Sequence, residues 1–448
     1  RRVMELLVGN TEDALESGSV YTKQQRIAEL AARMPAAGLT SLAYHIDKDW
    51  LCEAYQQTRK DGAAGVDEVT AAEYEQNLDE NLSSLLERFK SGSYFAPPVK
   101  RVYIAKEGKK GAKRPIGMPT LEDKVLQRAV VMLLSPVYEQ DFMDCSYGFR
   151  PGRSCHQALE ALWKAVMSMG KTCWVLEVDI KSYFDTVKHE HLRAFYKKRV
   201  RDGVIQRILG KWLKAGIMED GALRYPLEGT PQGGVVSPLL SNIYLHEVLD
   251  VWFAQEVRPR LKGKAEMVRY ADDFVFVLSD GEDARRLLGV LPKRFGRYGL
   301  EIQKEKTRLL KFSRPSGRGQ GKPGSFTFLG FTHYWGKSRK GNWVVKRKTA
   351  KDRLSRSIKR VHLWCKANRH LSVKDQQQRL RSKLQGHYGY FGITFNSRSI
   401  ACVYEQAKRS WQKWLNRRSR NNPMPWERFN RLLMRYPLPE PRIVHRFS

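Results

Sequence analysis

Short apolar runs predict β-strands in the first three quarters of the chain. The runs are rich in β-branched and aromatic residues and are bounded by turn residues, which favours strands over 100–106, 174–178, 268–278 and 326–331. A basic, Gly-containing turn joins the first of these runs to a second one that ends at 119, which predicts a hairpin. Helices are expected over 21–34 and 42–58, before the first strand, and over 125–134, between the hairpin and the strand at 174–178.

The last quarter of the chain carries a helical pattern instead. Leu354, Ile358, Val361 and Cys365 follow one another at spacings of 4, 3 and 4, which places them on one face of a helix. Two further faces of the same kind are formed by Leu380, Leu384 and Tyr388, and by Ile400, Val403, Ala407, Trp411 and Trp414. The pattern predicts three amphipathic helices, each basic on its outer side.

Positive charge is concentrated in that same quarter. The chain of 448 residues has a formal net charge of +33, and residues 336–448 contain 29 Lys and Arg against 5 Asp and Glu. Five tryptophans are interleaved with these cations: Trp343, Trp364, Trp411, Trp414 and Trp426. A solvated basic face is the simpler alternative, but an imbalance of this size favours a polyanionic partner. Nucleic acid is favoured over an anionic membrane surface because no lipid-facing apolar stripe accompanies the charge.

The sequence predicts neither a membrane-spanning helix nor a disulfide framework. No apolar run approaches the ~20 residues that a membrane-spanning helix needs. The six cysteines include no Cys-x-x-Cys pair, so we expect buried thiols in a reducing cytosol. A zinc site at Cys145, Cys155 and His156 is the disfavoured alternative, since structural zinc requires four well-spaced ligands.

Two adjacent carboxylates interrupt the apolar run at 268–278. Asp272 and Asp273 lie between two strands, and at the tight turn of a hairpin both side chains can point the same way. Burying two charges is costly unless a cation neutralises them, which makes a divalent metal the natural partner. A solvated Asp-Asp turn would be the ordinary interpretation of the dipeptide by itself.

A third acidic residue ends an earlier apolar strand. Asp179 follows the run at 174–178, far enough before Asp272 for a helical segment and a return strand to intervene. Two metal ions bridged by such carboxylates can stabilise the attacking and leaving oxygens of an in-line phosphoryl displacement. The three aspartates therefore predict a two-metal site for phosphoryl transfer.

Several intact motifs give the chain a family resemblance. Together with the Tyr-Ala-Asp-Asp turn they are Tyr-Gly-Phe-Arg-Pro-Gly-Arg-Ser at 147–154, Gly-Thr-Pro-Gln-Gly-Gly at 229–234 and His-Tyr-Gly-Tyr-Phe at 387–391. From about Gly62 to the C-terminus the chain resembles the group II intron-encoded reverse transcriptase/maturase family. The paired cysteines of the nuclease found in many relatives do not appear here, so the resemblance is to members without an evident endonuclease domain.

The resemblance implies an α+β fold shaped like a right hand. Residues 1–60 would form a helical N-terminal extension, and 61–335 would form the fingers and a palm with an antiparallel sheet. Residues 336–448 would form the basic, α-helical thumb or X domain of the maturases.

The resemblance also implies an RNA-dependent DNA polymerase site. Asp179, Asp272 and Asp273 would hold two Mg²⁺ ions, with the backbone carbonyl of Ile180 as a further ligand, while a primer 3′-hydroxyl attacks the α-phosphate of a dNTP. The nucleotide would be bound by Lys106, Arg114, Tyr183, Gln232 and Lys306. Tyr183 would pack beneath the sugar and exclude a 2′-hydroxyl, and Lys306 would lie near the pyrophosphate; an ordinary core aromatic and a surface lysine are the alternatives.

Further residues are expected to contact nucleic acid: Arg150, Arg153, Gly330, Arg417, Arg418 and Arg420. Arg150 and Arg153 would approach template phosphates, Gly330 the primer end, and the tail arginines any phosphate chain. For Phe149 and Pro151 we expect packing roles, and Ser154 is expected to cap the helix that follows it.

The resulting expectation is a cytoplasmic bacterial protein, associated with the nucleoid when it acts on DNA. Its partners would be group II intron RNA, which it helps to splice, and a DNA target and primer; a monomer and a homodimer both remain open. Two alternatives are a non-catalytic RNA chaperone or maturase, and a reverse transcriptase adopted for a host task such as phage defence.

Overall fold

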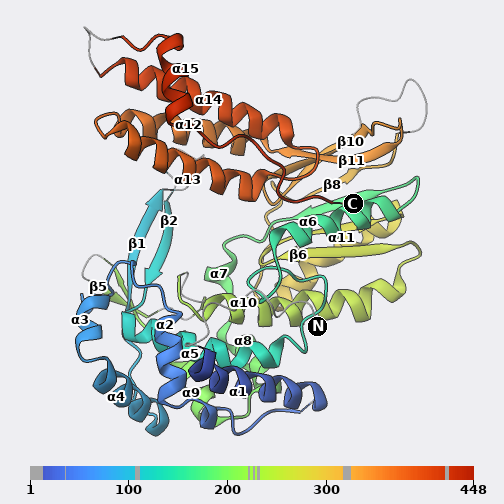
Figure 1. Cartoon of the computed structure of the whole chain (residues 1–448). Coiled ribbons are helices and arrows are strands. Elements are labelled where there is room, and N and C mark those ends of the chain that lie inside the picture. The colour runs from blue at the N-terminus through green and yellow to red at the C-terminus, as the bar shows by residue number, and fades with distance from the viewer. Residues whose placement is uncertain are drawn as a thin grey trace. The chain divides into compact units, whose positions relative to one another are not determined.

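The structure is a computed structural model that divides into two compact units. It describes residues 14–448 except 36, 106–110, 112, 220–221, 226–227, 230–232, 316–323, 419–422 and 448, and for 14–19 it describes the backbone alone. The first unit comprises residues 1–158 and 176–309, and the second comprises 159–175 and 310–448 (Figure 1). Lys106, Gln232 and Arg420, which the sequence predicts to be functional, lie outside the described residues.

The first unit begins with a group of helices packed around one central helix. These are α1 (Ala14–Arg33), η1 (Ala43–His45), α2 (Lys48–Gln56), α3 (Ala71–Gln76), α4 (Leu78–Ser91) and the central α5 (Leu121–Tyr138). Trp50 is buried against α5, and its Nε1 donates to the carbonyl of Ala129 at 3.0 Å. The helices predicted over 21–34 and 125–134 are confirmed, whereas the one predicted over 42–58 is divided between η1 and α2.

A buried carboxyl group fixes the first turn of α5. Thr120 caps the helix, and Asp123 accepts hydrogen bonds from the Tyr94 hydroxyl at 2.9 Å, Trp212 Nε1 at 2.7 Å and Gln127 Nε2 at 2.8 Å. Burial raises the pKa of Asp123 to about 6, because these donors offset only part of the cost of placing a charge there. The acid therefore ties three elements of the first unit together.

Two sheets follow: one lies within the first unit, and the other lies mainly in it, with its residues 174–175 and 310–311 assigned to the second unit. One has the order β2-β1-β4-β5, from β1 (Val99–Ala105), β2 (Lys113–Met118), β4 (Ile217–Glu219) and β5 (Ala222–Arg224). β1 and β2 are antiparallel, which confirms the predicted hairpin. The other has the order β6-β7-β3-β8, from β3 (Trp174–Val178), β6 (Ala265–Tyr270), β7 (Asp273–Leu278) and β8 (Arg308–Lys311).

Helices and helical turns connect the strands of these sheets. They are α7 (Tyr183–Thr186), α8 (His189–Arg199), α9 (Gly203–Lys214), α10 (Ser237–Leu245), η2 (His246–Asp250), η3 (Phe253–Val257), η4 (Arg258–Arg260) and α11 (Gly281–Arg297). Phe274, Phe276 and Leu278 in β7 are completely buried, as expected for a strand with a neighbour on both sides. The sheet core therefore forms around β7.

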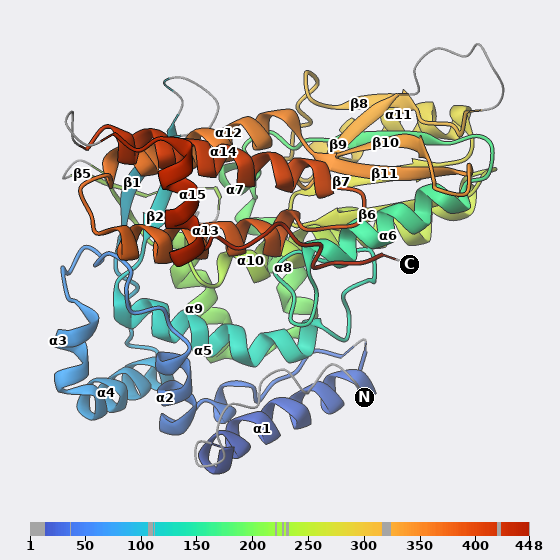
Figure 2. The ribbon, with the colours of Figure 1, turned by 45° about the horizontal axis from the view of Figure 1, so that its top comes forward.

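The second unit combines a three-stranded sheet with a helical bundle. Its elements are most of α6 (Cys155–Ser168), β9 (Ser325–Phe328), β10 (Phe331–Lys337), β11 (Trp343–Thr349), α12 (Lys351–Ala367), α13 (Val373–Phe391), α14 (Ser397–Asn416) and α15 (Trp426–Arg435). The strands are antiparallel in the order β11-β10-β9. Figure 2 shows α12, α13 and α14 running side by side, which confirms the three helices predicted for the tail.

The apolar faces predicted for the tail do form one core. Leu380, Leu384 and Ile400 are buried in it, and Trp411 and Trp414 belong to it as well. The two tryptophans are therefore core residues and not exposed rings on which a nucleobase could stack. Trp411 is fully buried and donates from Nε1 to Gln376 Oε1 at 2.9 Å.

Three simpler expectations concern membrane spans, the cysteines and a helix cap. Among the described residues, none of the helices has the length and apolarity needed to span a membrane. Cys173 and Cys365 are buried as expected, but Cys402 is exposed. Ser154 caps α6 as predicted, because its hydroxyl accepts from Gln157 N at 3.2 Å while Gln157 Oε1 accepts from Ser154 N at 2.7 Å.

Candidate active site

The hairpin of β6 and β7 turns sharply at the paired carboxylates. Tyr270 pairs with Asp273, so the turn consists of the two residues Ala271 and Asp272. Ala271 has φ +57°, in the left-handed region that two-residue hairpins usually fill with glycine or asparagine. An alanine held there costs on the order of 1 kcal/mol or more, so neighbouring structure must fix the turn.

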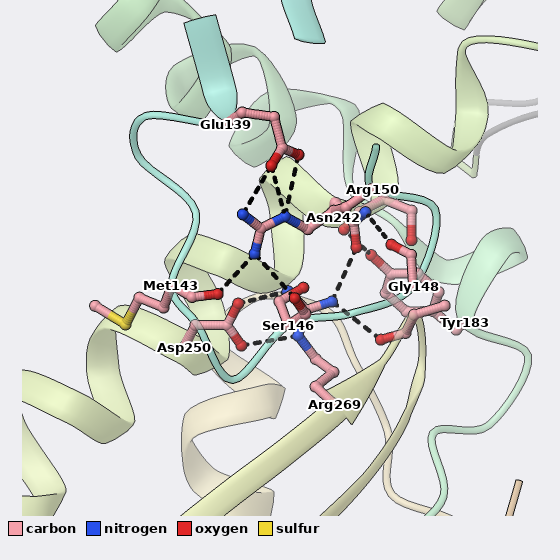
Figure 3. A network of polar contacts seen from close by, with 11 residues as sticks. Glu139, Met143, Ser146, Gly148, Arg150, Tyr183, Asn242, Asp250 and Arg269 are labelled. Carbon is pink, nitrogen blue, oxygen red and sulfur yellow. Dashed lines mark hydrogen bonds and ion pairs between the residues drawn. The ribbon is translucent and has the colours of Figure 1, made fainter. Parts of the chain in front are cut away.

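A fully buried arginine supplies part of that support (Figure 3). Arg269, the penultimate residue of β6, donates from Nε to Asp250 Oδ1 at 2.8 Å and pairs through Nη2 with the other carboxylate oxygen. Its Nη1 donates to Asn242 Oδ1 at 3.0 Å and to the carbonyl of Ala271 at 3.1 Å. Burial alone would lower the pKa of Arg269, but the Asp250 carboxylate outweighs it and the pKa is raised. The charged guanidinium therefore stabilises the turn through its hydrogen bond to the Ala271 carbonyl.

The loop before α6 supports the turn from the other side. Residues 145–147 run beside β6, with Arg269 N donating to the Cys145 carbonyl at 2.8 Å and Tyr147 N to the Arg269 carbonyl at 2.9 Å. A Cβ on Gly148 would lie 2.3 Å from Ala271 N, so only glycine allows this approach. Asn242 Nδ2 donates to the Gly148 carbonyl at 2.7 Å, which connects both supports.

The third predicted aspartate lies at the same end of the sheet. β3 ends at Val178, one residue before Asp179, and it is the neighbour of β7, which begins at Asp273. The backbone of Asp179 is fixed by Gln303 N, which donates to its carbonyl at 2.8 Å, and by Thr307 Oγ1, which accepts from its N at 3.3 Å. The charge of Asp179 also acts on the Asp272 carboxyl, so Asp179 is not on the opposite side of the unit from the turn.

The electrostatics of Asp272 reflect that proximity. Burial raises the pKa of its carboxyl, and the Asp179 charge raises it further, while Arg114 and Arg269 act in the opposite direction. The described residues contain no group of three or more His, Cys, Asp or Glu side chains already arranged around a common point where a metal could bind. The structure thus brings Asp179 and Asp272 into mutual electrostatic range, with Asp273 exposed beside them.

Two predicted nucleotide-binding cations lie near these carboxylates. Lys306 Nζ donates to Asp179 Oδ2 at 2.7 Å. Arg114 is in β2, where it lies opposite Ile104 of β1 in the strand register, and its charge acts to lower the pKa of the Asp272 carboxyl. The residues fit a divalent cation, because two carboxylates that repel each other, one of them partly buried, present the charge that such an ion neutralises.

Tyr183 is packed inside the unit. It is 2% exposed, and its hydroxyl donates to the carbonyl of Ser241 at 2.9 Å. Its ring packs edge-to-face on Phe184, with 5.3 Å between centroids, and Phe184 is partly exposed. A direct contact between the Tyr183 ring and a nucleotide sugar is therefore not available in this conformation, whereas Phe184 has free surface.

Arg150 corrects one prediction. Its side chain is almost completely buried, with Nε and Nη2 donating to the Glu139 carboxylate and Nη1 to the carbonyls of Met143 and Ser146, at distances of 2.7–3.1 Å (Figure 3). A guanidinium engaged in this way cannot also bind a template phosphate. The arginine instead fixes the loop that supports the turn.

Phe149 reverses a second expectation. We expected a packing role for its side chain, but it is 59% exposed, with φ +58°. Its ring lies 6.4 Å from that of Tyr270, measured between centroids. A strained backbone that holds an apolar ring outward beside a candidate site is a functional indication.

The other residues predicted to bind metal or nucleic acid make contacts within the chain. Arg153 pairs with Asp144 at 2.6 Å and lies over the Tyr147 ring, while the Ile180 residue that was expected to offer a carbonyl ligand forms a bridge to Ile302. In the second unit, Gly330 has φ +79° and accepts from Ala350 N at 2.9 Å. Arg417 lies over the Trp414 ring, and Arg418 donates to the Leu371 carbonyl.

Sequence reasoning missed the residues that fix the turn: Gly148, Asn242, Asp250 and Arg269. A signal was present, because an arginine inside the apolar strand 265–270 and an aspartate inside the apolar stretch 248–253 both require a buried partner. The sequence alone did not reveal that they are partners of each other.

A family model and several known proteins are similar to this chain. The family model for "Reverse transcriptase (RNA-dependent DNA polymerase)" matches residues 104–333. Protein YkfC of Escherichia coli (strain K12) is 37% identical over 286 residues, 57% of this chain and 74% of that protein. Group II intron-encoded protein LtrA of Lactococcus lactis subsp. cremoris is 35% identical over 246 residues, 53% of this chain and 40% of LtrA. Nuclear intron maturase 2, mitochondrial, of Arabidopsis thaliana is 28% identical over 222 residues, 39% of this chain and 30% of the maturase.

The chain belongs to the reverse transcriptase family, with mixed α/β content and sheets that contain antiparallel strand pairs. Within that family it is of the group II intron reverse transcriptase/maturase type. Its match covers less than half of LtrA's own length.

Proposed function

We propose that the chain is an RNA-dependent DNA polymerase whose reaction centre is formed by Asp179, Asp272 and Asp273. The observation that carries the proposal is the convergence of Asp179 and the Asp272 turn at one end of the β6-β7-β3-β8 sheet, within electrostatic range of each other. The buried Arg269 network supports it, since it keeps a strained turn in one shape.

Mg²⁺ is the proposed cofactor, held by these three aspartates, with the Ile180 carbonyl as a further ligand. Bound there, two such ions would reduce the charge on the reacting phosphate and favour a nucleophilic primer 3′-hydroxyl. The chain's own contribution is to hold the carboxylates in place and to keep Asp272 partly away from water, where its charge acts more strongly.

The dNTP is proposed to bind between the hairpin of β1 and β2 and this end of the sheet. Arg114 would offset triphosphate charge, together with Lys106 and Gln232. Lys306, whose ammonium already reaches the Asp179 carboxylate, is placed to donate a proton to the departing pyrophosphate.

Selection against a 2′-hydroxyl is proposed to depend on Phe184, with Tyr183 acting only through it. Tyr183 is anchored by its hydroxyl on the Ser241 carbonyl, so it would act by positioning Phe184, whose partly exposed ring would meet the sugar. A Phe184→Ala variant is then expected to incorporate ribonucleotides more readily than a Tyr183→Phe variant does.

The surrounding chain is proposed to form the parts of a right-hand polymerase. Residues 1–60 would be the N-terminal extension, 61–335 the fingers and palm, and 336–448 the thumb or X domain. The charge of 336–448 supports binding of structured intron RNA, with Arg417, Arg418 and Arg420 on phosphates, Gly330 near the primer end and Arg153 near the template. DNA target and primer complete the proposed partners.

Primer extension with Asp272→Asn tests the proposal. The purified chain is given an RNA template, an annealed DNA primer, dNTPs and Mg²⁺, and extension is compared with RNA binding measured in the same buffer. We expect the variant to lose extension and keep its affinity for RNA, since one carboxylate is lost from a strongly basic protein. Normal extension by the variant contradicts the assignment, and RNA binding by a wild-type chain that never extends a primer favours the RNA-chaperone alternative.

A further inference from the structure

A basic cavity lies in the first unit on elements that the proposed reaction centre does not use. Its volume is about 700 Å³, within the range of ~300–1,000 Å³ usual for ligand sites. Five cationic side chains line it: Arg193, Lys197, Arg207, Lys211 and Lys214. The described lining includes no Asp or Glu, so the positive charge of the cavity is not compensated from within it.

Helix α9 is built to present this face. Gly203, Gln206, Arg207, Gly210, Lys211 and Lys214 recur at helical spacing and all line the cavity, whereas Ile205, Ile208, Leu209, Trp212 and Leu213 of the same helix are buried. A Cβ on Gly210 would meet no atom within 4 Å, so the helix backbone is open to a ligand there.

Helix α8 adds a second basic stripe with spare hydrogen-bonding capacity. Arg193 and Lys197 are one turn apart on α8 and both line the cavity. The ion pairs made from α8 use Lys198 and Arg199 instead. Arg193 Nε is buried and has no hydrogen-bond partner among the described residues, which leaves a donor to be satisfied.

Two outward-facing aromatic rings border the cations. Phe95 is 73% exposed and Tyr225 is 66% exposed, although both belong to the cavity lining. Lys211 Nζ donates to the carbonyls of Gly92 and Tyr94, at 2.7 and 2.6 Å, and so fixes the loop that carries Phe95. Large aromatic rings kept in water beside phosphate-binding cations are the usual means of stacking an unpaired base.

We propose that this cavity binds a single-stranded or looped segment of RNA, with phosphates on α8 and α9 and a base stacked on Phe95 or Tyr225. The choice of RNA as partner rests on the proposed function, whereas the site itself does not. A duplex is disfavoured because its bases are stacked inside the helix and offer the two rings no free face. Neither ring nor any of the five cations belongs to the proposed reaction centre.

Charge reversal in the cavity tests the proposal on the full chain. Lys197→Glu with Lys214→Glu is compared with Arg286→Glu and Lys293→Glu, an equal change of charge at exposed positions of α11. The probe is a short fluorescent single-stranded RNA, titrated at several salt concentrations. We expect the cavity variant to lose roughly tenfold or more in affinity for the RNA. The slope of log affinity against log salt concentration should become shallower by about 1.4, as for two lost phosphate contacts on a single strand. The α11 variant should have a much smaller effect on both quantities. Equal losses in both variants overturn the proposal.

A second measurement does not depend on net charge. A photoreactive p-benzoylphenylalanine in place of Phe95 is expected to crosslink to the RNA, whereas the same group in place of Tyr44, also strongly exposed, is not. Equal crosslinking at both positions, full displacement of the RNA by AMP, or full displacement by phosphatidylglycerol vesicles would each contradict a binding site for an RNA strand.

The two proposals can fail separately. Primer extension by the wild-type chain is measured in parallel with RNA binding. A chain that extends primers but shows no difference between the cavity and α11 variants refutes the cavity site alone. A chain that cannot extend primers but shows the predicted difference refutes the polymerase assignment alone.

Discussion

Asp250→Asn is the most direct test of how the candidate site is held together. The substitution keeps the shape of the side chain and removes the charge that pairs with Arg269. Both side chains are completely buried, so the guanidinium would remain charged and without its counterion in the interior. Because the same guanidinium donates to the Ala271 carbonyl, the variant should disturb the turn as well as the stability of the unit.

The expected magnitude follows from burial. Removing one partner of a buried ion pair costs roughly 3–5 kcal/mol. Two unit charges 4 Å apart interact by about 4 kcal/mol at an effective dielectric constant of about 20, which gives the same order. With a denaturant slope of about 3 kcal/mol per molar urea, the unfolding midpoint should fall by roughly 1 M or more.

The assay is urea unfolding of Asp250→Asn beside a matched control. Glu266→Gln removes a charge from the pair with Arg258, which is 2.9 Å long but exposed on both sides, and should cost less than about 1 kcal/mol. Primer extension per folded molecule should fall in Asp250→Asn and stay normal in Glu266→Gln. If the two variants unfold at the same urea concentration, the buried network does not stabilise the turn and the reasoning fails.

Two further predictions concern an exposed ring and a buried acid. Phe149→Ala should change stability by less than about 0.5 kcal/mol because the ring is largely exposed. It should nevertheless raise the KM for template–primer by roughly fivefold or more if the ring stacks on a base, with Phe149→Trp retaining function; an unchanged KM would show that the ring has no such role. Asp123 has a folded-state pKa of about 6, above the ordinary 3.8, so its protonated form favours the fold. The stability of the wild type relative to Asp123→Asn should therefore be highest below about pH 4, fall by roughly 3 kcal/mol as the pH rises through 6, and stay level above that. A relative stability that rises over this range in urea unfolding would mean that the folded state prefers the ionised acid.

Local periodicity carried the sequence predictions that the structure confirms. The hairpin at 268–278, the strand 174–178 and the three tail helices each depend on spacing within one element, and all are present. The spacing of Asp179 from Asp272 left room for the two to converge, and the family resemblance implied that they do, but no pattern within one element places one strand beside another.

Tertiary partners explain where the sequence predictions failed. An arginine in a loop is a typical phosphate-binding residue, but the guanidinium of Arg150 donates to Glu139 and to two loop carbonyls instead. The sequence of 147–154 gives no sign of these partners. Phe149 was expected inside because apolar residues usually are, but a left-handed backbone turns it outward. Tyr183 shows the reverse case, since a residue predicted to contact the nucleotide sugar is buried and anchored by its hydroxyl.

The supports of the Ala271–Asp272 turn all precede it in the chain. Gly148, Asn242 and Asp250 come before the hairpin, and so do the Glu139 and Arg150 that fix the Gly148 loop. During synthesis from the N-terminus, all of these supporting residues therefore leave the ribosome before the strained turn does. The turn can close onto a surface that has already been synthesised, so its unfavourable backbone conformation is adopted only when the contacts that offset it are available.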